Sequence, residues 1–169
     1  MTILLAKTAQ LRWQTDLSLL LHPIQQQVTA LNWLVADLEY HFIDDQQPRT
    51  IVAWDTEGWY AIVTGQGLYE SVANRDIQVI WGVFCGMVGD IPNLTEDEAP
   101  YVDGSEKLWA KPEAFQLASS EIEIVCCDSS LTLVKFRDES LGRLFLEAFP
   151  DGRIVQSADD MLKSYQERP

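Results

Sequence analysis

Residues 121–136 constrain the fold more than any other part of the chain. Two runs rich in Ile, Val and Leu flank a polar centre at residues 128–130, and Ile122 and Ile124 alternate with glutamates. This alternation is typical of an antiparallel hairpin with one face on the core and one in water. The segment therefore predicts a half-solvated antiparallel sheet, in which a shift of one residue would turn every apolar side chain to the wrong face.

The remaining chain alternates between helical and strand-like segments. Helical spacing of apolar side chains predicts helices over residues 11–24, 65–74, 139–149 and 157–166; β-branched and aromatic runs predict strands over residues 1–6, 31–43, 50–54, 59–63 and 77–88. Three short segments are interpreted as a polar connector, a loop and one helical turn: residues 25–27, 44–48 and 112–117. The pattern indicates an α+β fold, with an antiparallel or mixed sheet and helices packed mainly on one face. We expect five side chains to be largely buried: Ile122, Ile124, Leu131, Leu133 and Leu144.

Length and charge narrow the classes of function. The 169 residues fit one domain over residues 1–169, and a chain of this size buries about two thirds of its unfolded surface. Its 26 acidic and 12 basic residues give a formal net charge of −14, which opposes binding to nucleic acid and to anionic membranes. Such a charge favours a cationic partner or serves only solubility.

The cysteines indicate a reducing compartment. Cys126 and Cys127 are neighbours that point to opposite faces of a strand, and Cys85 lies in another apolar strand, so no disulfide framework is expected. The apolar start of the chain stops at Lys7, and neither a signal peptide nor a membrane span is predicted. The cytoplasm is therefore the predicted location.

Residues 90–106, here called the acidic segment, differ in composition from the rest of the chain. They contain six acidic residues, no basic residue and two prolines. Long loops inside compact domains are often functional or mobile, and carboxylates without basic neighbours repel one another. We expect an exposed and mobile loop, which either binds a partner or only solubilises the protein.

Tryptophans supply the other half of a candidate binding surface. Most of the six tryptophans fit a core position, but a ring beside the turn at residues 55–58 can face solvent. An exposed tryptophan within an acidic field is a typical anchor for a cationic protein. The predicted binding residues are Trp54, Trp59, Trp109, Asp90, Glu96, Asp97, Glu98 and Asp103.

Three motifs invite a chemical interpretation, and each has a simpler structural one. His41 followed by Asp44 lacks a second histidine or cysteine at metal-ligand spacing. Cys127 beside Asp128 has acidic neighbours, which raise the pKa of a thiol. Residues 65–67 lack the remaining residues of a phosphate-binding loop. We therefore predict no catalytic residue, no metal site and no cofactor.

Short motifs lie in a fixed order along the chain: Leu20-Leu21-His22-Pro23-Ile24 before the Trp33 strand, Thr64-Gly65, Ile80-Trp81-Gly82-Val83-Phe84, Ser119-Ser120-Glu121-Ile122-Glu123, Asp128-Ser129, and Asp138 before a helix. Together they cover most of the sequence. This layout resembles a small bacterial single-domain family of unknown function. The resemblance implies a single-domain α+β fold without a defined activity, and it makes the acidic segment an insert.

Three hypotheses of function follow. The first is a protein-binding module of the immunity or antitoxin type, which neutralises a basic partner. The second is a small-ligand or regulatory module that uses a tryptophan-lined face. The third is a hydrolase with carboxylates between Asp37 and Asp45, which requires Asp37 or Glu39 buried beside His41. The sequence leaves monomer and homodimer open.

Overall fold

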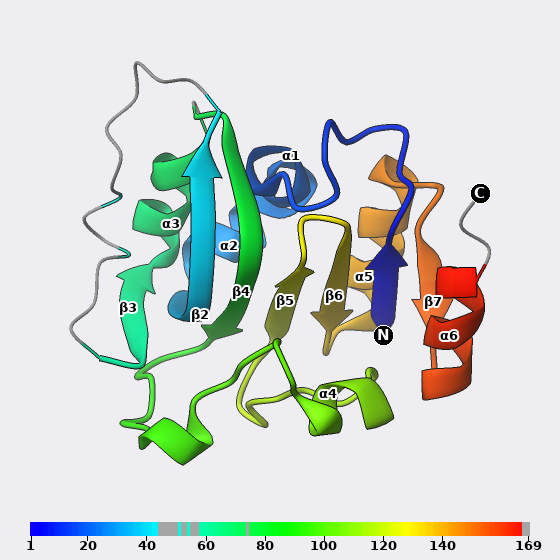
Figure 1. Ribbon diagram of the computed structural model, residues 1–169. Coiled ribbons are helices and arrows are strands. Elements are labelled where there is room, and N and C mark those ends of the chain that lie inside the picture. The colour runs from blue at the N-terminus through cyan, green and yellow to red at the C-terminus, as the bar shows by residue number, and fades with distance from the viewer. Residues whose placement is uncertain (44–50, 52–53, 55–57, 74, 167–169) are drawn as a thin grey trace.

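The computed structural model describes residues 1–43, 51, 54, 58–73 and 75–166. Its seven strands form one antiparallel sheet in the order β3-β2-β4-β5-β6-β1-β7 (Figure 1). The strands are β1 (Thr2–Leu5), β2 (Asn32–Phe42), β3 (Tyr60–Thr64), β4 (Ile77–Met87), β5 (Ile122–Cys127), β6 (Leu131–Phe136) and β7 (Arg153–Val155). The helices are α1 (Leu17–Leu21), η1 (His22–Ile24), α2 (Gln25–Ala30), α3 (Gly65–Val72), η3 (Glu96–Glu98), α4 (Glu106–Ala110), α5 (Glu139–Ala148) and α6 (Ala158–Gln166). The predicted α+β class is confirmed.

Most of the helices pack on one face of this sheet. Helices α1, α2, α3 and α5 lie behind the strands in Figure 1. They bury Leu20, Val28, Leu68 and Phe145 against the sheet, in a core that also holds Trp33. Burial of apolar surface at about 25 cal/mol per Å² makes this layer the main source of stability.

The opposite face is covered over β5 and β6, so the prediction of a hairpin with one face in water was wrong, whereas Glu39 and His41 of β2 and Ile62 of β3 are exposed. All residues of β5 and β6 are buried. The chain between β4 and β5, here called the covering segment (residues 88–121), crosses in front of the lower part of the sheet (Figure 1). It buries Val102, Leu108 and Leu117 in a second core, to which Met161 of α6 adds. The two faces of β5 are buried in two different cores, because the irregular covering segment forms a second layer over the sheet.

A proline did not end the first helix. Pro23 lies in the first turn of η1, where its missing amide hydrogen costs nothing, and α2 then continues through residues 25–27. The predicted connector is therefore helical. Residues 112–117 form turns rather than the predicted helical turn, because the helix of this segment falls earlier, at α4.

Helix α5 exposes a side chain that was predicted to be buried. Leu144 is 44% exposed, whereas Phe145 is fully buried between the rings of Phe136 and Phe149, at centroid distances of 5.3 and 4.7 Å. Neighbouring helical residues point about 100° apart. Packing of the larger aromatic ring therefore turns Leu144 outward.

The hairpin predicted for residues 50–63 is wrong in its first strand. Of residues 50–54 only Ile51 and Trp54 are described, and neither lies in a strand: the Trp54 backbone N–H donates to the Ile51 carbonyl at 2.8 Å, and β3 pairs with β2. Residues 44–50, 52–53 and 55–57 lie outside the described residues, and so does the loop predicted at residues 44–48.

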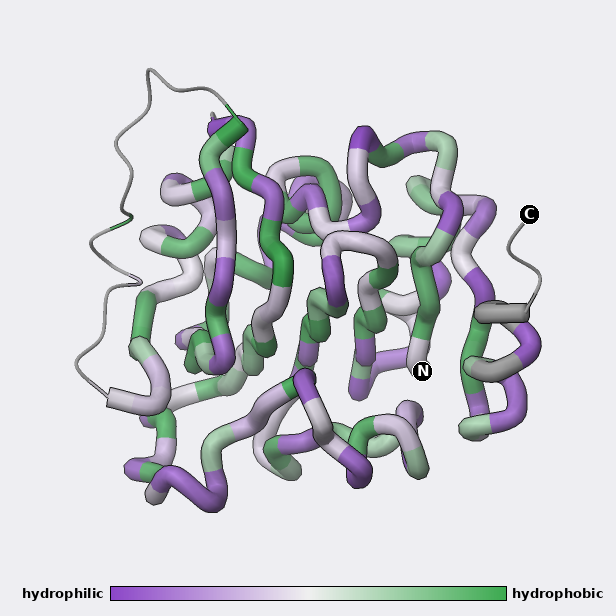
Figure 2. Tube along the Cα trace, viewed as in Figure 1, coloured by the Kyte–Doolittle hydropathy of each residue, from purple (hydrophilic) through white to green (hydrophobic). Residues whose placement is uncertain are grey.

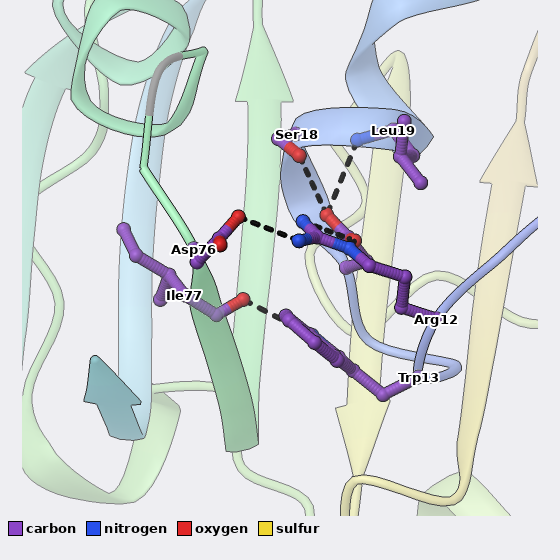
Figure 3. Close-up of polar contacts among 7 residues, drawn as sticks. Arg12, Trp13, Ser18, Leu19, Asp76 and Ile77 are labelled. Atoms are coloured by element: carbon purple, nitrogen blue, oxygen red, sulfur yellow. Dashed lines mark hydrogen bonds and ion pairs between the residues drawn. The ribbon is translucent and has the colours of Figure 1, made fainter. Parts of the chain in front are cut away.

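Polar contacts hold the chain before α1 against the start of β4 (Figure 3). The Arg12 guanidinium bonds Asp76 at 2.6 Å and Asp16 at 3.1 Å. The bond to Asp76 is the main reason why the pKa of Arg12 is raised. The Trp13 indole donates to the carbonyl of Ile77 at 3.1 Å. Asp16 in turn caps α1, so one buried carboxylate joins the helix to the sheet. Among the described residues, none of the helices is long and apolar enough to span a membrane.

Candidate functional site

A β-bulge in β2 places a carboxylate at the front of the sheet. The register between β2 and β4 shifts between Ala36 and Glu39, and Asp37 there adopts a φ of 50°. Aspartate tolerates this left-handed conformation better than most residues, and bulges often re-aim a side chain near a functional site. The Asp37 Oδ2 accepts a hydrogen bond from the backbone N–H of Val102 at 2.7 Å. The bulge thus holds the acidic segment against the sheet.

Two strand residues hold the beginning of the same segment. The Asn32 side-chain amide donates to the carbonyl of Gly89 at 2.9 Å. The Tyr60 hydroxyl donates to the Asn93 side chain at 3.1 Å and accepts from the backbone N–H of Leu94 at 3.0 Å. These contacts oppose the mobility expected from the sequence. The segment carries its charge on a fixed backbone, and hydrophilic residues gather there at the lower left of Figure 2.

A short helical turn sets the direction of the carboxylates within the segment. Thr95 and Glu98 form a capping box around η3: the Glu98 carboxylate accepts from the Thr95 backbone N–H at 2.9 Å and from its hydroxyl at 2.8 Å. These bonds lower the pKa of Glu98. Glu96 and Asp97 precede it in the turn and are exposed. Glu98 thus supports the turn, while Glu96 and Asp97 face outward.

The bulge, the start of β3 and the acidic segment together line a hollow of about 440 Å³, here called the Trp59 hollow. Its aromatic walls are Trp59 and Tyr101, which are 56% and 46% exposed. Asp37, Glu96 and Asp97 also line it. None of the described residues that line it is lysine, arginine or histidine. The arrangement combines exposed ring faces with negative charge, which suits a cation.

A second hollow of about 440 Å³ shares the lining residues Asp97, Ala99, Pro100 and Tyr101 with the Trp59 hollow. Lys107 and Lys111 of the α4 region line it together with Asp97 and Glu98, so its charge is mixed. The Tyr101 backbone N–H donates to the Gln116 side chain at 3.2 Å across this region. The backbone beside these shared residues is therefore held by Gln116 at Tyr101 and by Asp37 at Val102.

The structure separates the predicted binding residues into three groups. Trp59, Glu96 and Asp97 meet in one hollow. Asp90, Glu98 and Asp103 are exposed on the acidic segment but do not line the Trp59 hollow. Trp54 is buried against Tyr40 and Phe84, and Trp109 is half-buried and packs against the second core, so Trp59 is the most exposed of the three tryptophans. All six acidic side chains of the segment are exposed, as predicted.

Sequence reasoning missed four residues of the hollow, of which Asp37 and Tyr101 carry its chemistry. Asp37 was placed within a regular strand, although aspartate is disfavoured at strand centres and could have signalled the bulge. Tyr101 follows Pro100 in an irregular segment, where no periodicity indicates its direction. The hydrogen bond between Asp37 and Val102 brings these two distant parts of the sequence together, and the packing of Val102 in the second core adds to it.

A buried ion pair holds the covering segment against the sheet, and neither of its side chains is accessible to a substrate. Lys135 Nζ lies 2.8 Å from Glu123 Oε1, and both side chains are fully buried. Glu123 Oε2 accepts from the backbone N–H of Gln116 at 2.7 Å, while Lys135 donates to the carbonyl of Ala114 at 2.5 Å. The pair therefore ties residues 114–116 to the sheet.

The cysteines are part of the two cores. Burial raises the pKa of the Cys126 thiol to about 12. Burial, followed by the charge of Glu123, raises the pKa of the Cys85 thiol well above its usual value. Cys127 lies in the second core, opposite Cys126, and no disulfide joins the three cysteines, as predicted. Thiols of this kind are not activated nucleophiles.

The arrangement that the hydrolase hypothesis requires is not present. Glu39 and His41 are both exposed, and Asp37 is half-buried with its carboxylate bonded to Val102. Within the described part of the chain, no three His, Cys, Asp or Glu side chains form a group that could hold a metal ion. Binding through the Trp59 hollow is the chemistry that the described residues favour.

Comparison with known proteins identifies no relative. No family model, curated protein or solved structure is significantly similar to this chain. The resemblance to a small bacterial family therefore stays a prediction, and the function has to be inferred from the site itself.

Proposed function

We propose that this chain is a protein-binding module whose acidic face engages a basic protein, as immunity and antitoxin proteins do. One observation carries the proposal: Trp59 is 56% exposed in a hollow that it shares with Asp37, Glu96 and Asp97. Large exposed aromatic side chains are enriched at the centres of protein interfaces. Carboxylates around such a ring select for a positively charged partner.

Electrostatics supports the same proposal at longer range. The net charge of −14 creates a negative field that accelerates encounter with a basic surface, and salt weakens this field. The acidic segment presents Glu96, Asp97, Asp103 and Glu106 on a backbone anchored to β2 and β3. A fixed backbone reduces the entropy lost on association, because less of the interface has to become ordered.

A capture experiment tests the proposal. The immobilised protein is exposed to an extract of its source organism at low and at high salt, and bound proteins are identified by mass spectrometry. We expect a protein with a basic surface to be retained at low salt and released at high salt. Neutralisation of a toxic effect of that partner on co-expression would identify the immunity or antitoxin type.

Two variants make the capture specific. Trp59→Ala removes the exposed ring, and we expect it to lose the partner. Leu144→Ala removes an apolar side chain of similar exposure from α5, on the opposite face of the sheet, and should retain the partner. Absence of any basic protein from the wild-type capture at both salt concentrations would remove the proposed function.

A further inference from the structure

We infer that the Trp59 hollow is a socket for one arginine side chain of the basic partner. This inference rests on the proposed function, and it names the group that the acidic face recognises. The hollow of about 440 Å³ lies within the usual size range of sites for one small organic group. Its chemistry separates arginine from lysine in three respects.

The first respect is the aromatic lining. Trp59 and Tyr101 line the same hollow and expose 56% and 46% of their surface. A guanidinium group is planar and weakly hydrated, so it stacks on a ring face at little desolvation cost. A lysine ammonium group is compact and strongly hydrated, and it gains less from the same ring.

The second respect is the position of the carboxylates. Glu96 and Asp97 are exposed neighbours at the start of η3, and they line the hollow together with the aromatic rings. Arginine presents several N–H donors in a fixed plane and can bond carboxylates bidentately, whereas lysine acts as a point charge. Glu98 does not line this hollow, and its Oε2 accepts two hydrogen bonds from Thr95.

The third respect is the rigidity of the walls. Asp37 fixes the backbone of Val102 at 2.7 Å, directly after Tyr101, and Gln116 accepts from the Tyr101 backbone N–H at 3.2 Å. Pro100 between the carboxylates and the ring is buried. A rigid socket discriminates by shape, since a side chain of another geometry cannot make the walls adapt to it.

Two labelled peptides of equal charge test the inference. One is a pentalysine peptide, and the other has arginine in place of the central lysine; dissociation constants are measured by fluorescence anisotropy at low salt. We expect the arginine peptide to bind about two- to fivefold more tightly, as a single cation–π contact of about 0.5–1 kcal/mol at an exposed site predicts. Trp59→Ala and Glu96→Gln/Asp97→Asn should each bring this ratio close to one.

A matched variant separates recognition from net charge. Asp90→Asn/Asp103→Asn removes the same charge from the same segment at residues that do not line the hollow. We expect it to weaken both peptides equally and to keep the ratio. Equal binding of both peptides to the wild type overturns the arginine socket and leaves the binding of basic proteins intact. If neither peptide binds, both proposals are overturned. A preference for arginine that survives Trp59→Ala overturns the arginine socket alone.

Discussion

Replacing Lys135 by methionine should destabilise the protein more than any other single loss of charge among the described residues. The ammonium group lies 2.8 Å from Glu123 and both side chains are fully buried. With an effective dielectric constant of about 20, the Coulomb attraction at this distance is about 6 kcal/mol. Removal of one partner from a buried pair usually costs about 3–5 kcal/mol, because the other charge remains without compensation. In Lys135→Met, Glu123 keeps the backbone donor of Gln116, which offsets part of the loss.

Urea unfolding measures this loss directly. With a slope of about 2 kcal/mol per M, a cost of about 4 kcal/mol shifts the midpoint by about 2 M. In thermal unfolding the same cost corresponds to about 8–16 °C for a chain of this size. Lys111→Met is the matched control, since Lys111 is exposed, and its free energy of unfolding should change by less than about 0.5 kcal/mol.

The double variant Lys135→Met/Glu123→Gln tests the cause of the loss. Glutamine keeps a carbonyl acceptor for the Gln116 N–H but carries no charge, so no uncompensated charge stays buried when Lys135 is removed. We therefore expect the double variant to be more stable than Lys135→Met alone. A single variant no more destabilised than Lys111→Met would refute the argument, and so would a double variant at the sum of its single losses.

Three further predictions concern other parts of the fold. Asp37→Ala should lower the free energy of unfolding by about 1–3 kcal/mol and speed amide exchange at Val102, because it removes the acceptor of that N–H and leaves alanine at positive φ. Asp37→Asn should be close to the wild type. Equal effects of the two variants would contradict the role of the bulge. Gly65→Ala should disrupt the packing of α3 on α2, because its Cβ would lie 1.9 Å from the carbonyl oxygen of Val28, and a midpoint of unfolding like that of the wild type would contradict this. The folded pKa of the Cys126 thiol is about 12, above the value near 9.0 of an unfolded thiol, so its contribution to stability is complete below pH 9 and is lost progressively from pH 9 to about pH 12. The variant Cys126→Ala should lose less stability across this range than the wild type. The same dependence of unfolding free energy on pH in both proteins would contradict the assignment.

The order of elements was largely predictable because local patterns determine it. Strand β4 and helix α5 were expected within one or two residues of their observed bounds, and both carry a strong periodic signal. The hairpin of β5 and β6 was also expected from its polar centre, and the structure shows Asp128 and Ser129 there in left-handed conformations. Such elements depend on side chains only a few positions apart, which a single sequence contains.

The second layer of the sheet was not predictable in the same way. Glu123 alternates with isoleucines in the manner of a solvent-facing residue, yet its carboxylate is buried against Lys135. Its environment depends on residues 114–117, whose irregular backbone has no period to recognise. Only the tertiary arrangement determines whether a polar face of a strand meets water or a buried partner.

The candidate site likewise combines residues whose exposure the sequence predicts with residues whose exposure only the tertiary arrangement determines. Exposure of Glu96 and Asp97 followed from their composition alone, because carboxylates without basic neighbours stay solvated. The choice of Trp59 rather than Trp54 could not follow from composition, since both flank the same turn in the sequence. The difference arises because Trp54 packs into the aromatic cluster around Phe84.

The rate of association with the captured basic protein tests the central claim most directly. Stopped-flow or surface measurements over a range of salt concentrations would compare the wild type with Glu96→Gln/Asp97→Asn/Glu98→Gln, in which glutamine keeps the capping box of η3. The control variant Glu113→Gln/Glu147→Gln/Asp159→Asn removes three exposed carboxylates that do not line the Trp59 hollow. We predict slower association and a flatter salt dependence for the first variant only, with stability nearly unchanged. Equal rates and salt slopes for the wild type and the first variant would contradict the account and reduce the acidic segment to a solubilising insert.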